Sequence, residues 1–261
     1  MTFRRIAIAI AALAVLGGGT LFILDQTIFA PVESGTGTPV APTLAAPTQP
    51  AAEPAEPTSA APTAPSATEA AAPSTGASDT GAVLYRIDAS QSEVRYEVGE
   101  TFFNQNNRFA IAVGRTRGIA GDILVDFAQP SNSQIGEIAI DVSQFTSDES
   151  RRDNFIRRDG LQSSIYPTAR FVATSIEALP DQVAVGDQVT FTVNCDLTVK
   201  ETTRLVTWNL TLTVEDGRLV GSASTEILMS DFGVGPIQLP ILATEDLVKL
   251  FFDFVALPVE D

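Results

Sequence analysis

Residues 189–200 read VTFTVNCDLTVK, and every second residue from Val189 onward is apolar. Successive side chains of a β-strand point to opposite faces, so a period of two is typical of a strand with one buried and one solvated face. Residues 206–214 repeat the pattern as VTWNLTLTV, and Glu215-Asp216-Gly217 then turns the chain into a third such stretch, residues 218–227. These segments predict an antiparallel meander.

Shorter runs of the same kind predict further strands at 93–98, 109–113, 119–127, 137–142, 169–176 and 247–256. We therefore predict an all-β domain in residues 83–261, with about eight antiparallel strands that form a closed barrel or a sandwich. A domain of this size needs no disulfide or metal to be stable, and the single cysteine, Cys195, agrees with that. An eight-stranded barrel is filled by side chains or holds one small ligand, and an apolar, Phe-rich inner face suits either.

Residues 147–160 break the strand pattern and predict one short helix. Ser147 is the expected N-cap, acidic residues follow at 148–149, and two arginines at 157–158 precede Gly160 as the C′ residue. Each charge has the sign that complements the helix dipole. The helix is expected to cover one end of the barrel, where it would either gate an opening or plug it.

Residues 1–30 have the features of a membrane signal-anchor. Arg4 and Arg5 precede nineteen uncharged and mostly apolar residues, Ile6 to Leu24, which at about 1.5 Å per residue form a helix close to the hydrocarbon thickness. The positive flank predicts a single-pass protein of the cell membrane with its globular domain on the extracytoplasmic side. A cleaved signal is the alternative, although residues 26–30 lack a small-x-small cleavage pattern.

Residues 31–82 are rich in Ala, Pro and Thr and show no apolar periodicity. Ten of the sixteen prolines lie here, and no Lys or Arg occurs between Arg5 and Arg86. Such a composition cannot bury enough surface to offset the entropy of ordering the chain. We therefore expect a disordered linker that tethers the domain to the membrane.

The charge of the chain excludes one class of partner. Its formal net charge is −16, from 32 acidic and 16 basic residues. Nucleic acid is therefore not an expected partner, because phosphates require a basic face. Composition does not fix the oligomeric state, which stays open, a dimer included.

The sequence predicts that the protein is not an enzyme. The chain contains no histidine, so it cannot form a Ser-His-Asp or Cys-His arrangement. Cys195 lies on the apolar face of its strand, where a buried, inert thiol is expected rather than a nucleophile. The carboxylate pairs 148–149 and 245–246 match no calcium loop, and no cluster of Cys and His offers a zinc site. We expect no metal and no cofactor, other than a bound lipid.

A series of short motifs resembles the YceI-like family over residues 84–257. In chain order they are YRID (85–88) with QS (91–92) and VRY (94–96), VGRT (113–116) with GDI (121–123), DESRRD (148–153), YP (166–167) with Phe171, LT (197–198), and DFG (231–233). The resemblance implies a lipocalin-like barrel whose apolar tunnel takes up a long-chain isoprenoid, with the polar end of the ligand near the mouth. The family commonly has histidine at the positions of Gln91 and Phe155, and this chain does not.

The resemblance and the alternation together suggest a set of site residues. The candidates for the apolar lining are Tyr96, Phe171, Phe191, Trp208, Phe232, Phe252 and Phe254. The candidates for holding a head group are Arg151, Arg152, Arg157 and Arg158. Arginine forks can bind a phosphate through two hydrogen bonds, but the same arginines could instead tie the helix to the barrel. Trp208 likewise suits an ordinary core.

Two functions remain in competition at this point. The first is a membrane-tethered module that binds or carries a polyisoprenoid or a quinone-type lipid outside the cytoplasm, in a periplasm or at the cell surface. The second is a solid β-barrel that serves the cell envelope as a structural or protein-interaction module. The content of the barrel interior distinguishes them.

Overall fold

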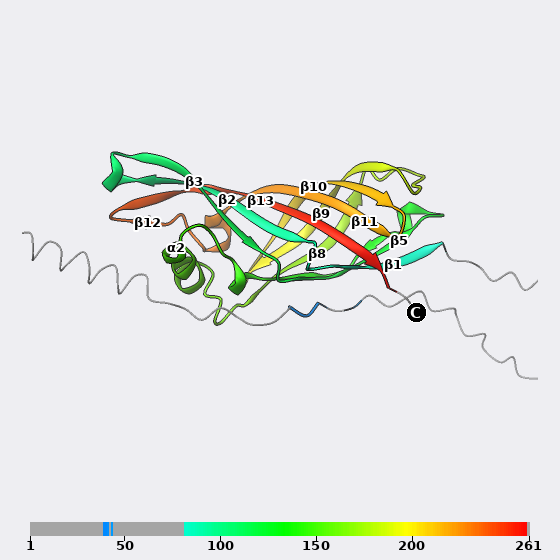
Figure 1. Ribbon diagram of the computed structural model, residues 1–261, viewed down its shortest axis with the longest axis horizontal. Helices are drawn as coiled ribbons and strands as arrows, with labels where there is room; N and C mark the ends of the chain where they lie inside the picture. The colour runs from blue at the N-terminus through cyan, green and yellow to red at the C-terminus, as the bar shows by residue number, and fades with distance from the viewer. Residues whose placement is uncertain (1–38, 42, 44–80, 260–261) are drawn as a thin grey trace, which may run out of the picture.

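The computed structural model describes residues 39–41, 43 and 81–259, and these contain one antiparallel sheet of 13 strands that curls into a half-barrel (Figure 1). The strands are β1 (Ala82–Ile87), β2 (Glu93–Phe102), β3 (Arg108–Thr116), β4 (Ile119–Ala120), β5 (Asp122–Asp126), β6 (Gln134–Ile135), β7 (Ile138–Asp141), β8 (Thr168–Glu177), β9 (Gln188–Val199), β10 (Thr202–Glu215), β11 (Arg218–Leu228), β12 (Gln238–Leu239) and β13 (Leu242–Pro258). The all-β prediction is confirmed. The expected count of about eight strands was too low, and the sheet forms a half-barrel rather than a fully closed barrel.

The strand count was too low because several strands are too short to show a period. β4, β6 and β12 have two residues each, whereas alternation becomes recognisable only over about four residues. The expected strand 119–127 is in fact two, β4 and β5, which separate at Gly121 and pair with different neighbours. A Cβ at Gly121 would lie 3.0 Å from Cγ1 of Ile138, so the backbones approach closely there.

The meander read from the sequence is confirmed as β9, β10 and β11. Phe191 pairs with Leu210, and Thr213 pairs with Val220, so the inward and outward faces are those expected. Phe191 is buried and Thr192 is not.

β13 organises the rest of the sheet. It has 17 residues and pairs with β11 along one edge. Its other edge pairs with β2 over the first part of the strand and with β1 near the C-terminal end, so two groups of strands diverge from it. β2 and β3 lie at the left of Figure 1, and β1 and β5 lie at the right.

The interior around Phe252 and Phe254 is a packed core. The rings of Phe252 and Phe254 lie 5.1 Å apart, and both residues are buried with Phe191. Phe254 lies over Gly221 of β11, where an added Cβ would be 2.3 Å from its ring. Glycine is therefore required at 221 for this ring to pack.

A short helix, α2 (Ser150–Phe155), continues directly into a π-helical segment, residues 156–160, and lies against the left-hand end of the half-barrel (Figure 1). Glu149 is its N-cap, and its carboxylate accepts a hydrogen bond from the backbone N–H of Arg151. The prediction of Ser147 as the cap was wrong, because the Ser147 hydroxyl binds Asp153 instead, at 2.6 Å. Gly160 is also not C′ but the last residue of the π-helical segment.

No helix within the described residues is long and apolar enough to cross a membrane. The predicted anchor, residues 1–30, lies outside the described residues, as does almost all of the predicted linker, 31–82. Both stay predictions.

Candidate functional site

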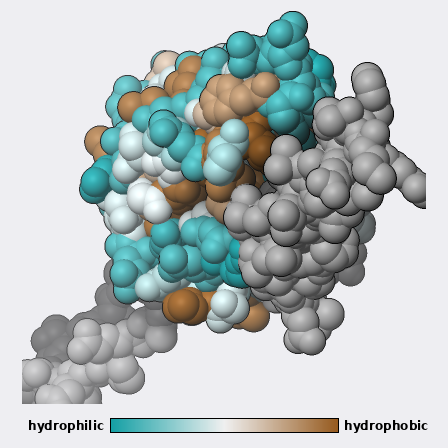
Figure 2. All heavy atoms as spheres, turned by 90° about the vertical axis from the view of Figure 1, so that its left-hand side faces the viewer, coloured by the Kyte–Doolittle hydropathy of each residue, from teal (hydrophilic) through white to brown (hydrophobic). Residues whose placement is uncertain are grey.

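A cavity of about 370 Å³ lies inside the left-hand end of the half-barrel, beneath α2. The inward residues of β2 form one wall; these are Val94, Tyr96, Val98, Glu100 and Phe102. The other walls come from β13, β11, β10 and β9, through Leu250, Ile227, Trp208 and Leu197. Figure 2, viewed from this end, shows hydrophobic side chains recessed between hydrophilic ones. The cavity is thus an apolar interior with a polar rim.

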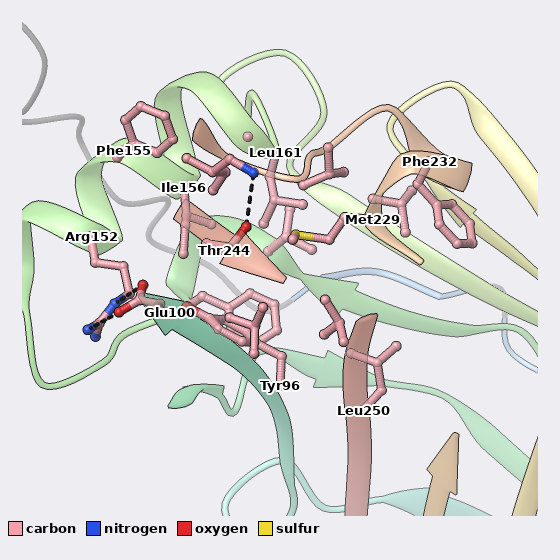
Figure 3. Close-up of a pocket in the computed structure, with 18 of the residues that line it drawn as sticks. Tyr96, Glu100, Arg152, Phe155, Ile156, Leu161, Met229, Phe232, Thr244 and Leu250 are labelled. Atoms are coloured by element: carbon pink, nitrogen blue, oxygen red, sulfur yellow. Dashed lines mark hydrogen bonds and ion pairs between the residues drawn. The ribbon is translucent and has the colours of Figure 1, made fainter. Parts of the chain in front are cut away.

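The helix and the turn after β11 complete the enclosure. Phe155, Ile156 and Leu161 line the cavity from the helical side, and Met229 and Phe232 line it from the 3₁₀ turn Met229–Phe232 (Figure 3). The expectation that the helix covers one end of the barrel is thereby met, and what it covers is a hollow rather than a filled interior.

Tyr96 is positioned by a glycine on the neighbouring strand. It pairs with Gly114 of β3, and a Cβ at Gly114 would be only 2.2 Å from the Tyr96 ring. The Tyr96 ring also meets the Phe145 ring edge-on, with the centroids 5.3 Å apart. Burial raises the pKa of the Tyr96 phenol, so the side chain is uncharged and contributes an aromatic ring with a hydroxyl group to the cavity wall.

The predicted apolar lining divides into two groups. Tyr96, Trp208 and Phe232 line the cavity. Phe171, Phe191, Phe252 and Phe254 are buried, but they do not belong to the cavity lining and lie in the packed part of the interior. The two groups touch through Phe171 and Trp208, whose rings meet edge-on at 6.1 Å.

Arg152 is bound by protein carboxylates at the cavity mouth. Its Nε and Nη2 donate to the two carboxylate oxygens of Glu100, at 2.9 and 3.0 Å (Figure 3). Its Nη1 donates to Ser147 and to Asp148. Burial lowers the pKa of Arg152, but these hydrogen bonds outweigh burial and hold the pKa above its ordinary value. The positive charge is therefore compensated within the protein.

The other three arginines do not join Arg152 in one anion site. Arg157 is buried and donates to the backbone oxygen of Phe145, at 3.0 Å, which ties the helix to the segment before it. Arg158 pairs with Asp159. Arg151 is exposed and lines the mouth beside Arg152. Only two of the four head-group candidates thus reach the cavity.

Sequence reasoning missed the main polar residue of the site. The strand expected at 93–98 extends to Phe102, and Glu100 continues its inward face after Val94, Tyr96 and Val98. A carboxylate at an inward position is costly unless it is paired, so the extended alternation alone could have marked Glu100 as a site residue.

The described residues offer no obvious reactive chemistry. They contain no group of three or more His, Cys, Asp and Glu side chains that could hold a metal. Cys195 is fully buried, and burial raises the pKa of its thiol to about 12. What the arrangement can do is remove an apolar molecule from water.

Comparison with known proteins gives a consistent result. Residues 85–256 match the family model of the YceI-like domain. The crystal structure of Burkholderia cenocepacia BcnA is similar, with 22% sequence identity and a TM-score of 0.51, over 65% of this chain and 98% of that one. A polyisoprenoid binding domain from Saccharophagus degradans, implicated in plant cell wall breakdown, has 13% identity and a TM-score of 0.51, over 68% and 99%. At these identities the two structures show a shared fold, and no curated protein matches the chain.

Proposed function

Because this chain belongs to the YceI-like domain family, we propose that its half-barrel binds an apolar lipid of the isoprenoid class in the cavity beneath α2. The observation that carries the proposal is the cavity itself, whose walls are apolar and whose polar groups lie at the rim. Its volume is within the range of small-molecule sites, about 300–1,000 Å³. Burial of each methylene there would contribute about 0.8 kcal/mol to binding.

The electrostatics of the mouth favour a ligand with a neutral polar end. A phosphate would need an arginine fork, and the fork of Arg152 already holds Glu100 and Asp148. Binding a phosphate there would displace the buried carboxylate of Glu100, which is unfavourable. A quinone or an alcohol requires only a hydrogen-bonding partner at the rim. We therefore propose a neutral isoprenoid over an isoprenoid phosphate.

The competing proposal, a solid barrel that only presents its surface to other proteins, has less support. The packed end around Phe191 and Phe254 would suit it. The cavity beneath α2 does not suit a solid barrel, because an interior built only for stability is close-packed with few voids larger than a water molecule. The same cavity, with no histidine in the chain, supports binding without catalysis.

We further propose that residues 6–24 hold the domain at the outer face of a membrane, with 31–82 as a tether. The support is the sequence: a long apolar run after two arginines and then a proline-rich segment. The full-length chain should stay with the membrane fraction through washes in high salt and alkali. A mature soluble form that begins near residue 30 would show instead that the segment is a cleaved signal.

Trp208 provides a direct test of lipid binding, since it is the only tryptophan in the chain and it lines the cavity. Titration of the full chain with a neutral quinone bearing a short isoprenoid side chain should quench its fluorescence saturably. Native mass spectrometry should show one adduct per chain. If the quinone caused no quenching and no adduct were detected, the proposal would be contradicted.

A matched pair of variants shows whether the quinone that quenches Trp208 fluorescence is bound in the cavity. Val98→Phe adds volume to the wall of the cavity, whereas Glu97→Gln changes the neighbouring residue on the outer face of β2. Val98→Phe should weaken quenching and Glu97→Gln should leave it unchanged. An isoprenoid monophosphate of equal chain length should bind more weakly than the quinone. Tighter binding of the monophosphate would favour a charged ligand.

A further inference from the structure

The cavity lining ends part-way along the strands of the half-barrel, and on β2 it reaches Val94, the partner of Phe252. On β13 the inward residues Val248 and Leu250 line the cavity, and the next inward residue, Phe252, does not. On β10 the same change occurs between Trp208 and Leu210. The hollow part and the packed part are therefore two segments of one continuous interior, divided across neighbouring strands.

On the strands on the far side of Trp208 the lining ends nearer the helix, because the register partner of Trp208 is Val193, which does not line the cavity. On β9 Leu197 lines the cavity and the next inward residue, Cys195, does not. On β8 Ala169 lines it and Phe171 does not. Phe171 lies directly against the ring of Trp208. Phe171 and Phe252 are thus the first aromatic side chains beyond the cavity on their strands.

Small residues beside Phe252 leave room for its ring. Its partner on β11 is Ala223, and the next inward pair along these strands is Phe254 with Gly221. The Phe252 and Phe254 rings pack against each other at 5.1 Å. If Phe252 were shortened, the space that its ring fills would be continuous with the cavity wall at Leu250, whereas Phe254 would still close the interior behind it.

We propose that Phe252, with Phe171 beside Trp208, is the stop that sets the maximum chain length of the bound lipid. This inference rests on the proposed function, because it concerns how far an apolar chain can enter the same cavity. Affinity should rise about fourfold with each added methylene that is buried. The affinity should stop rising once the end of the lipid chain contacts Phe252 and Phe171.

The test measures binding against chain length. Quinones with one to four isoprene units are titrated into the full chain, with Trp208 fluorescence as the readout. For the unmodified protein the affinity should rise and then level off. For Phe252→Ala the plateau should move to a chain at least one isoprene unit longer, with the affinity for the shortest quinone within about twofold of the original, since the mouth is unchanged.

Two other aromatic residues of β13 serve as controls. They distinguish a cavity made deeper by the loss of the Phe252 ring from a general loss of stability. Phe251 lies on the opposite face of β13, under the guanidinium of Arg95 at 4.3 Å. Phe251→Ala should leave the plateau where it was. Phe254→Ala should lower thermal stability as Phe252→Ala does, yet also leave the plateau in place, because Phe252 still stands between Phe254 and the cavity. An equal lengthening in Phe254→Ala would overturn the proposal.

A variant in the opposite direction keeps the test decisive if Phe252→Ala does not fold. Ala169 lines the cavity on β8, two residues before Phe171. Ala169→Leu should move the plateau to a shorter chain, and Phe252→Leu should move it to a longer one. Unchanged plateaus in variants that still bind the shortest quinone would refute the chain-length stop and leave the proposed function standing. Failure of every quinone to bind the unmodified chain would refute both.

Discussion

The guanidinium of Arg152 meets the carboxylate of Glu100 through two parallel hydrogen bonds, 2.9 and 3.0 Å long, across 52 residues of sequence. The Glu100 side chain is 4% exposed and that of Arg152 is 15% exposed. The pair joins the inner face of β2 to α2, so it holds the helix over the cavity. A paired geometry of this quality is what makes a buried carboxylate tolerable in an apolar wall.

Removal of Arg152 should therefore be destabilising. Arg152→Ala leaves Glu100 buried without its partner and should lower the free energy of unfolding by about 3 kcal/mol. The double variant Glu100→Met with Arg152→Met should lose less, because it leaves no unpaired charge. Urea denaturation measures both. Arg158→Ala, which removes the partly exposed pair with Asp159, is the control and should change stability by less than about 1 kcal/mol.

The alternation of β9 predicts unequal effects at neighbouring positions. Phe191→Lys places an unpaired charge in the packed core and should prevent stable folding. Thr192→Lys points to the other face and should change the unfolding free energy by less than about 0.5 kcal/mol. Thermal unfolding monitored by circular dichroism gives both values. Equal losses would mean that the two faces of the strand are exchanged.

A third prediction concerns the close approach of Gly114 and Tyr96. Gly114→Ala should force the Tyr96 ring away from β3 and into the cavity, at a cost of about 1–3 kcal/mol in stability. Quinone affinity should fall as well, because the displaced ring takes up cavity volume. Val113→Ala, on the outer face of the same strand, is the control. An unchanged affinity in Gly114→Ala would show that the ring moves without entering the cavity.

The fourth prediction concerns the Cys195 thiol, whose pKa burial raises to about 12. In the unfolded chain a thiol ionises near pH 8.5, so between roughly pH 8.5 and 12 the unfolded state loses a proton that the folded state keeps. The contribution of this group to stability is complete below that range and is lost as the pH rises through it. At pH 8 iodoacetamide should modify Cys195 only after the protein is unfolded in urea. Rapid modification of the native protein would show that the thiol is not enclosed.

The sequence predicted the strands better than the position of the site, and there is a physical reason for the difference. Alternation shows which side chains point inward, so Leu250 and Phe252 are equivalent by that criterion. It does not show how deep along the barrel axis a residue lies, and depth decides that Leu250 lines the cavity while Phe252 packs beyond it. The division of the seven apolar candidates into two groups follows from this.

The polar part of the site was harder to predict for a different reason. Arg152 and Glu100 become partners only when β2 and α2 are brought together, and nothing local in the sequence marks the pair. Met229 and Ile237 lie in an irregular segment between β11 and β12, where no period exists to read. Such residues become visible as cavity walls only in the folded chain.

The long strand β13 also has a consequence for how quickly the domain can fold. The backbone N–H of Val255 donates to the hydroxyl of Ser92, and 163 residues separate the two. Bringing such distant segments together costs loop-closure entropy before any contact compensates for it, so domains rich in non-local strand pairs fold over milliseconds to seconds. In this protein β13 joins β1, β2, β11 and β12. Because residues of β2, β11 and β13 form its walls, the cavity cannot exist until these non-local strand pairs have formed.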